Sequence, residues 1–463
     1  MKKEKARKYL RFLGYGTGAF GMDLSYGLFF TFLNKYQTDI LLLTPRFLAV
    51  IATLCRIWDG VNDPMMGAVV DNTVSRFGKY RGWILLGAVL NAGALSLLFW
   101  NPGFPVTPGA MSAGLCIYAA LTCVLWDVTN TLMDIPFWSM VPSLTTDPRE
   151  RNIAATIPRA FSGLGNFAIV LLTVPMIERL GGQEGLNATG FHRWASLCGL
   201  VLVGMVTITF FSTRKMSAIA VTPPPKERFT FRTVVRTIRG NDQLLVFMLV
   251  ALLNNTGWYM VSGLAAYYFE DVLGNLRLMS LFGTLVGAGQ ALGLGMLPLL
   301  TRRLERNTVI KLAMGMTAAG YLGMYLFSAV INVFPLFMAF GFLGMMGVGC
   351  CFVSQTVMLS DVVDYGEYKL GYRSDSVVFS MKGFLQKGAY SLQALMMYIG
   401  LDLTGYDGAL ARQSSAAKTG ITVMMFLVPP LLTLAALALF SWKYKLDRGK
   451  MEEVTAAQSL RAL

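Results

Sequence analysis

Charged and polar residues recur at helical spacing within a short, otherwise apolar stretch from Arg56 to Pro64. Asp59 and Asp63 are four residues apart, so in a helix they lie one turn apart on the same face, near Asn62. An ionised side chain at the centre of a bilayer costs about 2.5 to 3.5 kcal/mol, so these carboxylates cannot face lipid. They must face a protein interior or a wet cavity. Two carboxylates beside an amide in such a cavity have the chemistry to bind a cation.

A second polar stripe consists of Asp127, Asn130, Thr131, Asp134 and Trp138, which recur every three or four residues and share one helix face. Carboxylate, hydroxyl and amide oxygens suit a hard cation, and an indole ring offers the flat apolar face on which sugars stack. Polar stripes also hold buried helices together, by hydrogen bonds worth only about 0.6 to 2 kcal/mol each. Because two such stripes occur in the first half of the chain, we favour binding over association.

Three further ionisable residues fall inside apolar stretches. Asp23 follows a run of glycines that allows close helix packing; it is either structural, paired with an arginine, or functional, as intramembrane charges usually are. Arg159 either holds hydroxyls or a carboxylate bidentately or anchors its helix at the membrane interface. Lys387 lies too deep in its span to be explained by a side chain that reaches the interface.

A cluster of charges surrounds the end of another apolar segment, and it includes Asp361, Asp364, Glu367, Lys369 and Arg373. One interpretation is a solvated loop. The other is charge pairing that gates the cytoplasmic side of the molecule.

The elements that must position these residues follow from composition. The chain has 463 residues, 54% of them hydrophobic and 14% charged, whereas about a quarter of the residues in soluble proteins are charged. Its apolar runs are long enough to span a membrane. They predict an all-α polytopic membrane protein with twelve transmembrane helices, at residues 14–40, 45–71, 82–100, 110–141, 157–178, 192–213, 244–270, 277–300, 308–329, 332–361, 377–400 and 418–442.

A long polar linker divides these helices into two sets of six. Residues 214–243 are rich in arginine and contain three consecutive prolines, at positions 223–225. We therefore predict a first six-helix half at residues 1–213, a cytoplasmic linker at 214–243, and a second half at 244–463 that ends in a cytoplasmic tail. Six plus six helices around a basic loop resembles the layout of the major facilitator superfamily.

The formal net charge of +14 is concentrated in alternate loops, and the loops between them carry few basic residues. This asymmetry predicts that both termini are cytoplasmic. It also argues against nucleic acid as a partner, because the charge serves topology. The six cysteines lie in apolar segments without metal-type spacing, and the single histidine, His192, has no partner pattern. With no nucleotide loop or catalytic serine motif, we expect neither an enzyme nor an organic cofactor.

Four motifs, in this order along the chain, resemble those of the glycoside-pentoside-hexuronide:cation symporters, a family within the major facilitator superfamily. They are residues 15–23 (YGTGAFGMD), 56–64 (RIWDGVNDP), 133–139 (MDIPFWS) and 361–369 (DVVDYGEYK). The resemblance runs nearly end to end. It implies a symporter of the bacterial inner membrane that moves a sugar or glycoside together with sodium, a proton or lithium.

The resemblance also implies roles for individual residues. Asp59, Asp63 and Thr131 match the family's cation site, and Asn62 influences which cation is taken. The positions that contact or border the sugar are Asp23, Asp134, Trp138, Arg159 and Lys387. The positions that match a cytoplasmic charge network, expected to act in gating, are Arg151, Asp361 and Asp364.

This sequence departs from melibiose-transporting members of the family at several positions around the sugar. Asn130 stands in place of a tyrosine, Phe352 in place of a tryptophan and Met22 in place of a lysine. Asp127 replaces a glycine and adds a carboxylate, and Gly383 replaces a threonine. We expect Asn130, Asp127 and Phe352 to line the substrate site. Because the cation positions are unchanged, we expect the coupling chemistry to be kept and the substrate to differ from a galactoside.

The expected mechanism is alternating access, in which the two halves expose a site near the midplane to one side at a time. The retained Asn62 favours sodium, although carboxylates that are desolvated and close together can also take a proton. One alternative is a facilitator-fold carrier of a lipid or another amphiphile. Another is a membrane enzyme or sensor, which no motif supports. In each case membrane lipid surrounds the protein.

Overall fold

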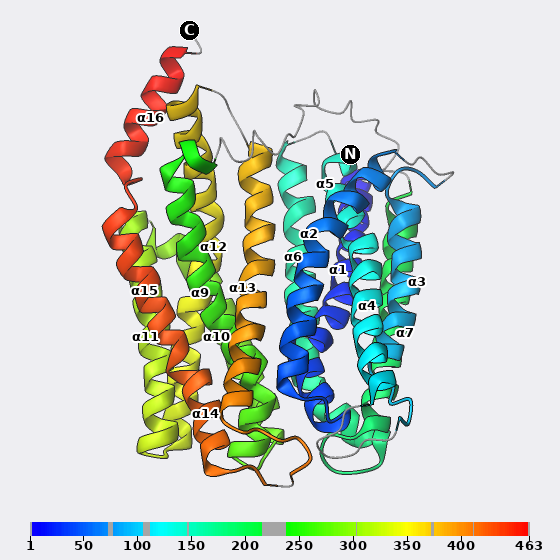
Figure 1. Cartoon of the computed structure of the whole chain (residues 1–463). Coiled ribbons are helices and arrows are strands. Elements are labelled where there is room, and N and C mark those ends of the chain that lie inside the picture. Colours follow the sequence, from blue (N-terminus) through cyan, green and yellow to red (C-terminus); the bar gives the residue numbers. More distant parts are fainter. Residues whose placement is uncertain are drawn as a thin grey trace. The chain divides into compact units, whose positions relative to one another are not determined.

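The computed structural model describes residues 2–72, 77–104, 112–145, 148–214, 238–301, 303–371, 375–410 and 412–461. Two predicted site residues, Asp59 and Arg151, lie in described helices, but their side chains are outside the described part, as is most of the predicted linker. The described residues form helices and no β-strand (Figure 1). In chain order, with η for π-helical turns, the elements are α1 (Lys2–Lys35), η1 (Tyr36–Ile40), α2 (Pro45–Asn72), α3 (Arg81–Leu98), α4 (Ala113–Ser139), α5 (Val141–Leu144), α6 (Pro148–Gly181), α7 (Ala188–Ser212), α9 (Asp242–Tyr267), η2 (Tyr268–Val272), α10 (Arg277–Leu300), α11 (Arg306–Tyr325), η3 (Leu326–Val330), α12 (Phe334–Leu370), α13 (Asp375–Leu403), α14 (Ser415–Phe426), α15 (Val428–Lys443) and α16 (Arg448–Arg461).

Nine helical segments within the described residues are long and apolar enough to cross a membrane. They coincide with nine of the predicted spans. Helices α1, α2 and α13, of 34, 28 and 29 residues, lie at the other three predicted positions. The all-helical membrane architecture predicted from hydropathy is therefore confirmed.

Local sequence explains where several helices begin and end. The side chains of Asn187, Asn241 and Ser414 each accept a hydrogen bond from a backbone N–H in the first turn of α7, α9 and α14. Such caps contribute about 0.5 to 2 kcal/mol each, because they satisfy amides that have no partner inside the helix. Helix α12 ends at Gly371, whose φ of +78° is the left-handed conformation that glycine adopts at low cost.

The chain separates into two compact units, and each is described by itself. Unit 1 contains Met1–Pro223 together with two short later segments, Phe269–Ser280 and Gly405–Gln413. Unit 2 contains Pro224–Tyr268, Leu281–Thr404 and Ser414–Leu463.

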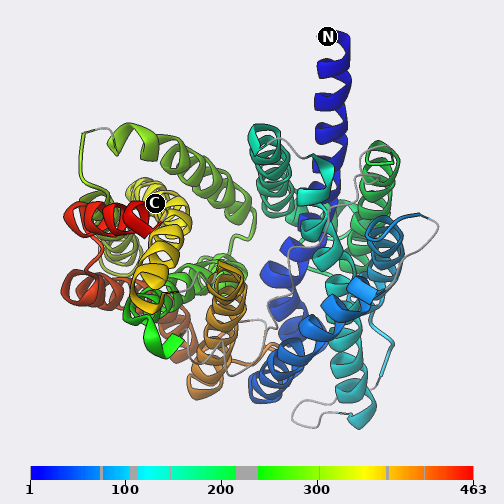
Figure 2. The same cartoon turned by 90° about the horizontal axis from the view of Figure 1, so that it is seen from above.

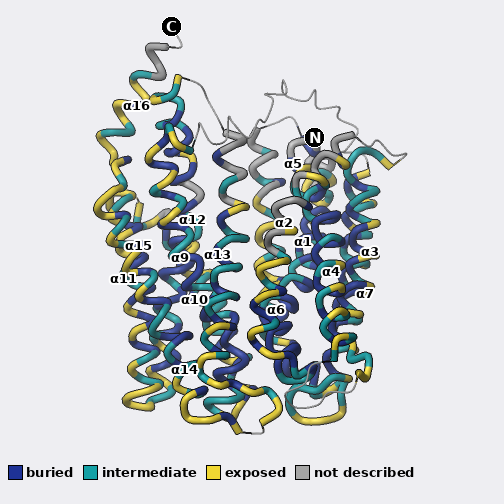
Figure 3. The backbone as a smooth tube through the Cα atoms, viewed as in Figure 1, coloured by how far each residue is buried: buried dark blue, intermediate teal, exposed yellow. Residues whose placement is uncertain are grey.

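Helix α1 is the central helix of unit 1. It packs along α6 and α7, and Figure 2 shows it between them. From residue 12 through residue 40, only Leu13 is exposed (Figure 3). Glycines make this close packing possible, as the sequence predicted: a Cβ on Gly18 would lie 2.6 Å from Thr209 Oγ1, and one on Gly21 would lie 2.9 Å from the backbone of Leu202. Asp23 is therefore carried on a helix that its neighbours hold tightly.

Unit 2 is built around α9, which packs against α13 and α15, and around the α11–α12 pair. The α11–α12 contact again depends on glycine, because a Cβ on Gly320 would lie 2.3 Å from the Cα of Gly344. At the far end of this unit α16 packs on α12. The core between these helices is apolar and includes Phe247, Met314 and Val362.

Candidate functional site

The two polar stripes of the first half come together in unit 1, where α2 packs against α4. The Thr131 hydroxyl donates to Asp63 Oδ1 at 3.2 Å. Thr131 is buried and Asp63 is half-buried. Asn62 is also buried, and its Nδ2 has no hydrogen-bond acceptor among the described residues. The structure thus places three of the four predicted cation-site residues, and the fourth, Asp59, one helical turn before Asp63.

The geometry of this pair fits a cation. Two oxygens 3.2 Å apart can both lie about 2.4 Å from one ion, a usual distance for oxygen ligands of calcium, and they then subtend nearly a right angle at it. No three described histidine, cysteine or acidic side chains gather into a metal site.

One turn further along α4, Asp134 and Trp138 form the centre of the predicted sugar region. The indole Nε1 of Trp138 donates to Asp134 Oδ1 at 3.0 Å. The guanidinium carbon of Arg159, on α6, lies 5.2 Å from the centroid of the Trp138 ring, within the range of a cation–π interaction. The Trp138 ring is thereby held by two contacts. Asp134 accepts from the N–H at its edge, and Arg159 lies over its face. This arrangement suits stacking and hydroxyl recognition.

Asp23 is held by a serine that the sequence did not indicate. Ser162 Oγ, on α6, donates to Asp23 Oδ2 at 2.5 Å. Ser162 follows Arg159 by three residues and so shares a helix face with it. Helix α6 approaches α1 closely here, because a Cβ on Gly165 would lie 2.5 Å from the Phe20 carbonyl oxygen. Spacing from Arg159 was the signal that could have identified Ser162.

Asn130 and Asp127 are both buried on α4. The amide of Asn130 donates to the Tyr26 hydroxyl at 2.8 Å. Tyr26 was also missed by the sequence analysis, although it follows Asp23 by three residues on the same face of α1. The residue that replaces a tyrosine of related carriers therefore contacts a tyrosine supplied by another helix.

A fully buried polar network connects α1, α3 and α4 next to the polar stripe of α4. Ser25 Oγ on α1 donates to Asn91 Oδ1 on α3 at 2.8 Å, and the Trp126 indole N–H on α4 donates to Ser25 Oγ at 3.0 Å. The Asn91 amide donates to the Trp126 carbonyl oxygen and to Thr129 Oγ1, at 3.2 and 3.1 Å. Each donor in the network has an acceptor, so α1, α3 and α4 are fixed in register beside the polar stripe.

The predicted residues of unit 2 are placed separately. Lys387 on α13 and Phe352 on α12 are both half-buried. Asp361 forms an ion pair with Arg306 at 2.6 Å, and Asp364 is half-buried on the same helix. Arg306, at the start of α11, was not predicted; it lies in a basic cluster that had been interpreted only as a topology signal.

Comparison with known proteins places the chain in a family. It matches the MFS/sugar transport protein family over residues 14–448. It is 25% identical to the uncharacterized symporter YjmB of Bacillus subtilis (strain 168), over 96% of this chain and 94% of that protein. It is 26% identical to the isoprimeverose transporter of Lactiplantibacillus pentosus, over 94% of this chain and 89% of that protein.

The fold is shared with a solved D-xylose-proton symporter, with a TM-score of 0.64, 12% sequence identity, and coverage of 94% of this chain and 97% of that chain. The chain therefore belongs to the MFS/sugar transport protein family and has the major facilitator fold. It is a multi-pass membrane transporter. The resemblance to the glycoside–cation symporters is confirmed, and so is the prediction of a transporter in place of an enzyme.

Proposed function

We propose that this protein is a symporter that carries a sugar or glycoside across the bacterial inner membrane together with a cation, and that the cation is sodium. The observation that supports this most directly is on α4. Thr131 contacts Asp63 of α2, and Asp134, three residues later on the same helix, accepts from Trp138. Helix α4 thus carries a proposed cation ligand, Thr131, and a proposed sugar-binding residue, Asp134, on neighbouring turns. Coupling of cation binding to sugar binding requires such a connection between the two sites.

Coupling follows from charge and geometry. A cation bound by Asp59, Asp63 and Thr131 offsets the repulsion between the two carboxylates and draws α2 and α4 together. Asp134 and Trp138 are then held in position to bind sugar. Because linkage is reciprocal, sugar must tighten cation binding by the same factor by which the cation tightens sugar binding. The relatives' names, a symporter and a transporter of isoprimeverose, support this class of substrate.

A matched pair of variants tests the proposal. Purified protein in lipid vesicles is screened for uptake of glycosides, pentosides and uronides, with a sodium gradient, a pH gradient or neither. Thr131→Val keeps the shape of the side chain and removes the oxygen, so it should lose sodium-stimulated accumulation. Thr131→Ser keeps the oxygen and should retain it.

Three results would count against this proposal. Accumulation driven equally well by a pH gradient without sodium would assign the coupling to protons. Uptake competed by lysolipid would favour an amphiphile carrier. Full sodium dependence in Thr131→Val would show that Thr131 is not part of the cation site.

The proposed cytoplasmic location of both termini is checked with a protease-cleavable tag at either end, which external protease should not cut in intact cells.

A further inference from the structure

A cavity of about 960 Å³ lies within unit 2, between α16, the start of α11 and the loop that joins α10 to α11. Its volume falls within the range of small-molecule sites, about 300 to 1,000 Å³. Helix α16 forms one wall beside α12, past the end of α15 (Figure 1). One lining residue, Asp361, was expected to act in gating, and none belongs to the predicted cation or sugar positions. The cavity is therefore a site separate from the one proposed for transport.

Hydrogen bonds between elements hold the walls of the cavity in place. Asn307 Nδ2, on α11, donates to the carbonyl oxygen of Leu446, just before α16, at 3.2 Å. The Tyr368 hydroxyl, on α12, donates to Glu453 Oε1, on α16, at 2.9 Å. Val454 of α16 is fully buried. Helix α16 is thus anchored to both neighbouring helices, and the cavity is part of the fold.

Arginines stand on three sides of the cavity: Arg303 in the α10–α11 loop, Arg306 at the start of α11 and Arg448 at the start of α16. Arg306 uses Nη1 to bind Asp361 at 2.6 Å, and Arg448 uses Nε to bind Glu452 at 3.0 Å. The guanidinium of Arg303 has no hydrogen bond or ion pair among the described residues. Because a guanidinium presents several N–H donors in a planar fork that matches phosphate oxygens, all three keep donors for an anion.

Carboxylates line the same cavity, so the ligand must offer more than negative charge. Two of them form the ion pairs with arginine just described. Asp447 Oδ1 accepts from the Lys450 N–H in the first turn of α16 at 2.8 Å. The carboxylate of Glu305, just before α11, has no hydrogen-bond donor or cation among the described residues. Within the described part of the chain, the ionisable groups of the cavity that lack a partner are therefore Arg303 and Glu305.

Neutral side chains on three elements add further acceptors. The hydroxyls of Thr301, after α10, and Thr455, in α16, donate to carbonyl oxygens one turn earlier, at 3.0 and 2.8 Å. Each hydroxyl oxygen can still accept, and so can Asn307 Oδ1. Acceptors spread over three elements suit a ligand with several hydroxyl groups, whereas a single ammonium group would need them gathered at one point.

We propose that this cavity binds a phosphate ester of a polyol, with the phosphate on the arginines and the hydroxyls on Glu305 and the neutral acceptors. Two sources share this chemistry: a soluble sugar phosphate, and the headgroup of phosphatidylglycerol. The first source rests on the proposed function, because phosphorylation is a reaction that consumes an imported sugar. Since Arg306 also holds Asp361, a bound phosphate acts on a residue that was expected to take part in gating.

The first arm of the test measures the soluble source. The purified full chain in phosphatidylcholine nanodiscs is titrated with glucose 6-phosphate or inorganic phosphate in a calorimeter. Glucose 6-phosphate should bind at least tenfold more tightly than inorganic phosphate. Arg303→Gln should weaken its binding at least tenfold, and Glu305→Gln about threefold. Lys311→Gln removes a charge from an exposed position of α11 outside the cavity and should change the affinity less than twofold.

The second arm measures the lipid source. The same variants are purified from vesicles that contain equal amounts of phosphatidylglycerol and phosphatidylethanolamine, and the lipids that stay bound are quantified by mass spectrometry. A bound phosphatidylglycerol headgroup should give at least tenfold enrichment over phosphatidylethanolamine in the wild type and in Lys311→Gln. Arg303→Gln should abolish this enrichment.

Dependence on Arg303 in the first arm would assign the cavity to a soluble ester, and in the second arm to the lipid; either result supports the proposal. Absence of binding in both arms would overturn it, as would equal effects of Arg303→Gln and Lys311→Gln. An anion site alone, with no preference for the polyol in either arm, would overturn it too. Neither arm measures transport, so a wild-type protein that takes up no sugar would count against the proposed function alone.

Discussion

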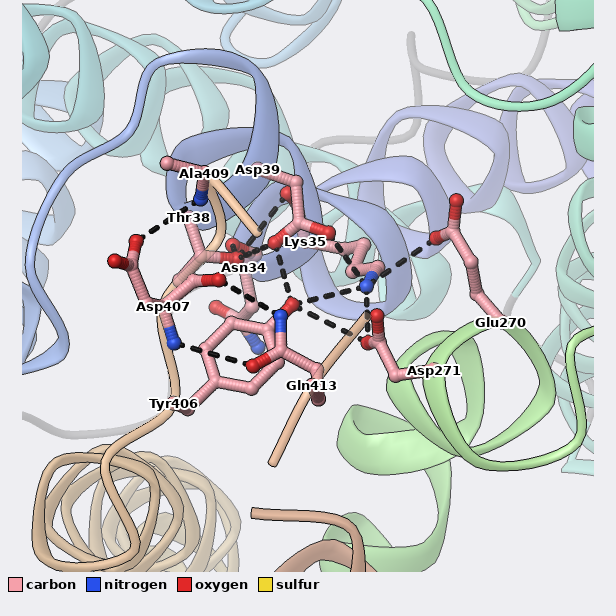
Figure 4. Close-up of polar contacts among 10 residues, drawn as sticks. All are labelled: Asn34, Lys35, Thr38, Asp39, Glu270, Asp271, Tyr406, Asp407, Ala409 and Gln413. Carbon is pink, nitrogen blue, oxygen red and sulfur yellow. Dashed lines mark hydrogen bonds and ion pairs between the residues drawn. The ribbon is translucent and has the colours of Figure 1, made fainter. Parts of the chain in front are cut away.

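Two regions of unit 1 contain carboxylates, and these carboxylates have different kinds of hydrogen-bond and ion-pair partners in the two regions. At the end of α1, the carboxylates of Asp39, Glu270 and Asp271 bind the ammonium group of Lys35, whose side chain is completely buried (Figure 4). At the predicted cation and sugar positions, Asp63, Asp134 and Asp23 each accept a hydrogen bond from a neutral donor, namely Thr131, Trp138 and Ser162. The first arrangement brings its own counter-charge and is complete. In the second, each of these carboxylates is oriented by a hydroxyl or an indole N–H, and our proposal assigns Asp63 to a bound cation.

The largest effect should come from removing a carboxylate of the second kind. Asp63→Asn should abolish cation-stimulated accumulation of sugar, because the amide keeps the size and one oxygen but loses the charge that binds the ion. Uptake in vesicles with and without a sodium gradient measures this. A variant that still concentrates sugar with full sodium dependence would show that Asp63 is not a cation ligand.

The next largest effect is expected in the free energy of unfolding, which a substitution at Lys35 should lower much more than a substitution at Asp63. Lys35→Met leaves three half-buried carboxylates, those of Asp39, Glu270 and Asp271, without the buried cation that they bind, and removing one partner of a buried pair costs about 3 to 5 kcal/mol. Unfolding of detergent-solubilised protein should show this loss. Asp63→Asn keeps the size of the side chain and an oxygen that can accept from Thr131, so it should change the unfolding free energy by less than about 1 kcal/mol. Equal losses in both variants would contradict the distinction drawn between the two regions.

A smaller effect is expected at the indole. Trp138→Phe keeps an aromatic face for sugar and for Arg159 but loses the N–H that donates to Asp134. We expect the sugar Kd to rise about tenfold, ~1.4 kcal/mol, with cation affinity in the absence of sugar unchanged. Calorimetry on purified protein measures both. A parallel loss of cation affinity would mean that the two sites are not separable at this residue.

The smallest effect should be at Ser162. Ser162→Ala removes one donor from Asp23, and a single hydrogen bond contributes about 0.5 to 1.5 kcal/mol. The sugar Kd should therefore rise about threefold to tenfold. Asp23→Ala should abolish sugar binding in the same assay. If Ser162→Ala weakened binding as much as Asp23→Ala, the serine would itself be a sugar ligand.

Two kinds of feature could be predicted from the sequence. One is a contact between residues close together in the chain, and the other is the set of polar residues that cannot face lipid. Asp134 and Trp138 are four residues apart on one helix, so spacing alone anticipated that they meet. Asp63 and Thr131 required only that two polar stripes face one cavity. In both cases the high cost of exposing polar groups to lipid leaves few alternatives.

What the sequence did not predict were partners supplied by other helices through ordinary residues. Ser162 and Tyr26 have common side chains whose roles depend on how α6 and α1 pack. Lys35 falls within the predicted span 14–40, but nothing in the sequence marks Asp271 or Tyr406 as its partner, since they lie hundreds of positions away. Pairing of this kind is a property of tertiary packing, which hydropathy and periodicity do not contain.

The glycines of α1 limit how the substrate range of this transporter can be altered. At Gly16 an added methyl group would meet the side chains of Ile157 and Phe161, which can shift, whereas at Gly21 it would meet the Leu202 backbone, which cannot. Variants that change recognition near Asp23 should therefore tolerate substitution at residue 16 and require glycine at residue 21. A change of substrate range can therefore use space gained by moving Ile157 and Phe161 beside Gly16, but it cannot gain space beside Gly21, where the Leu202 backbone is in contact.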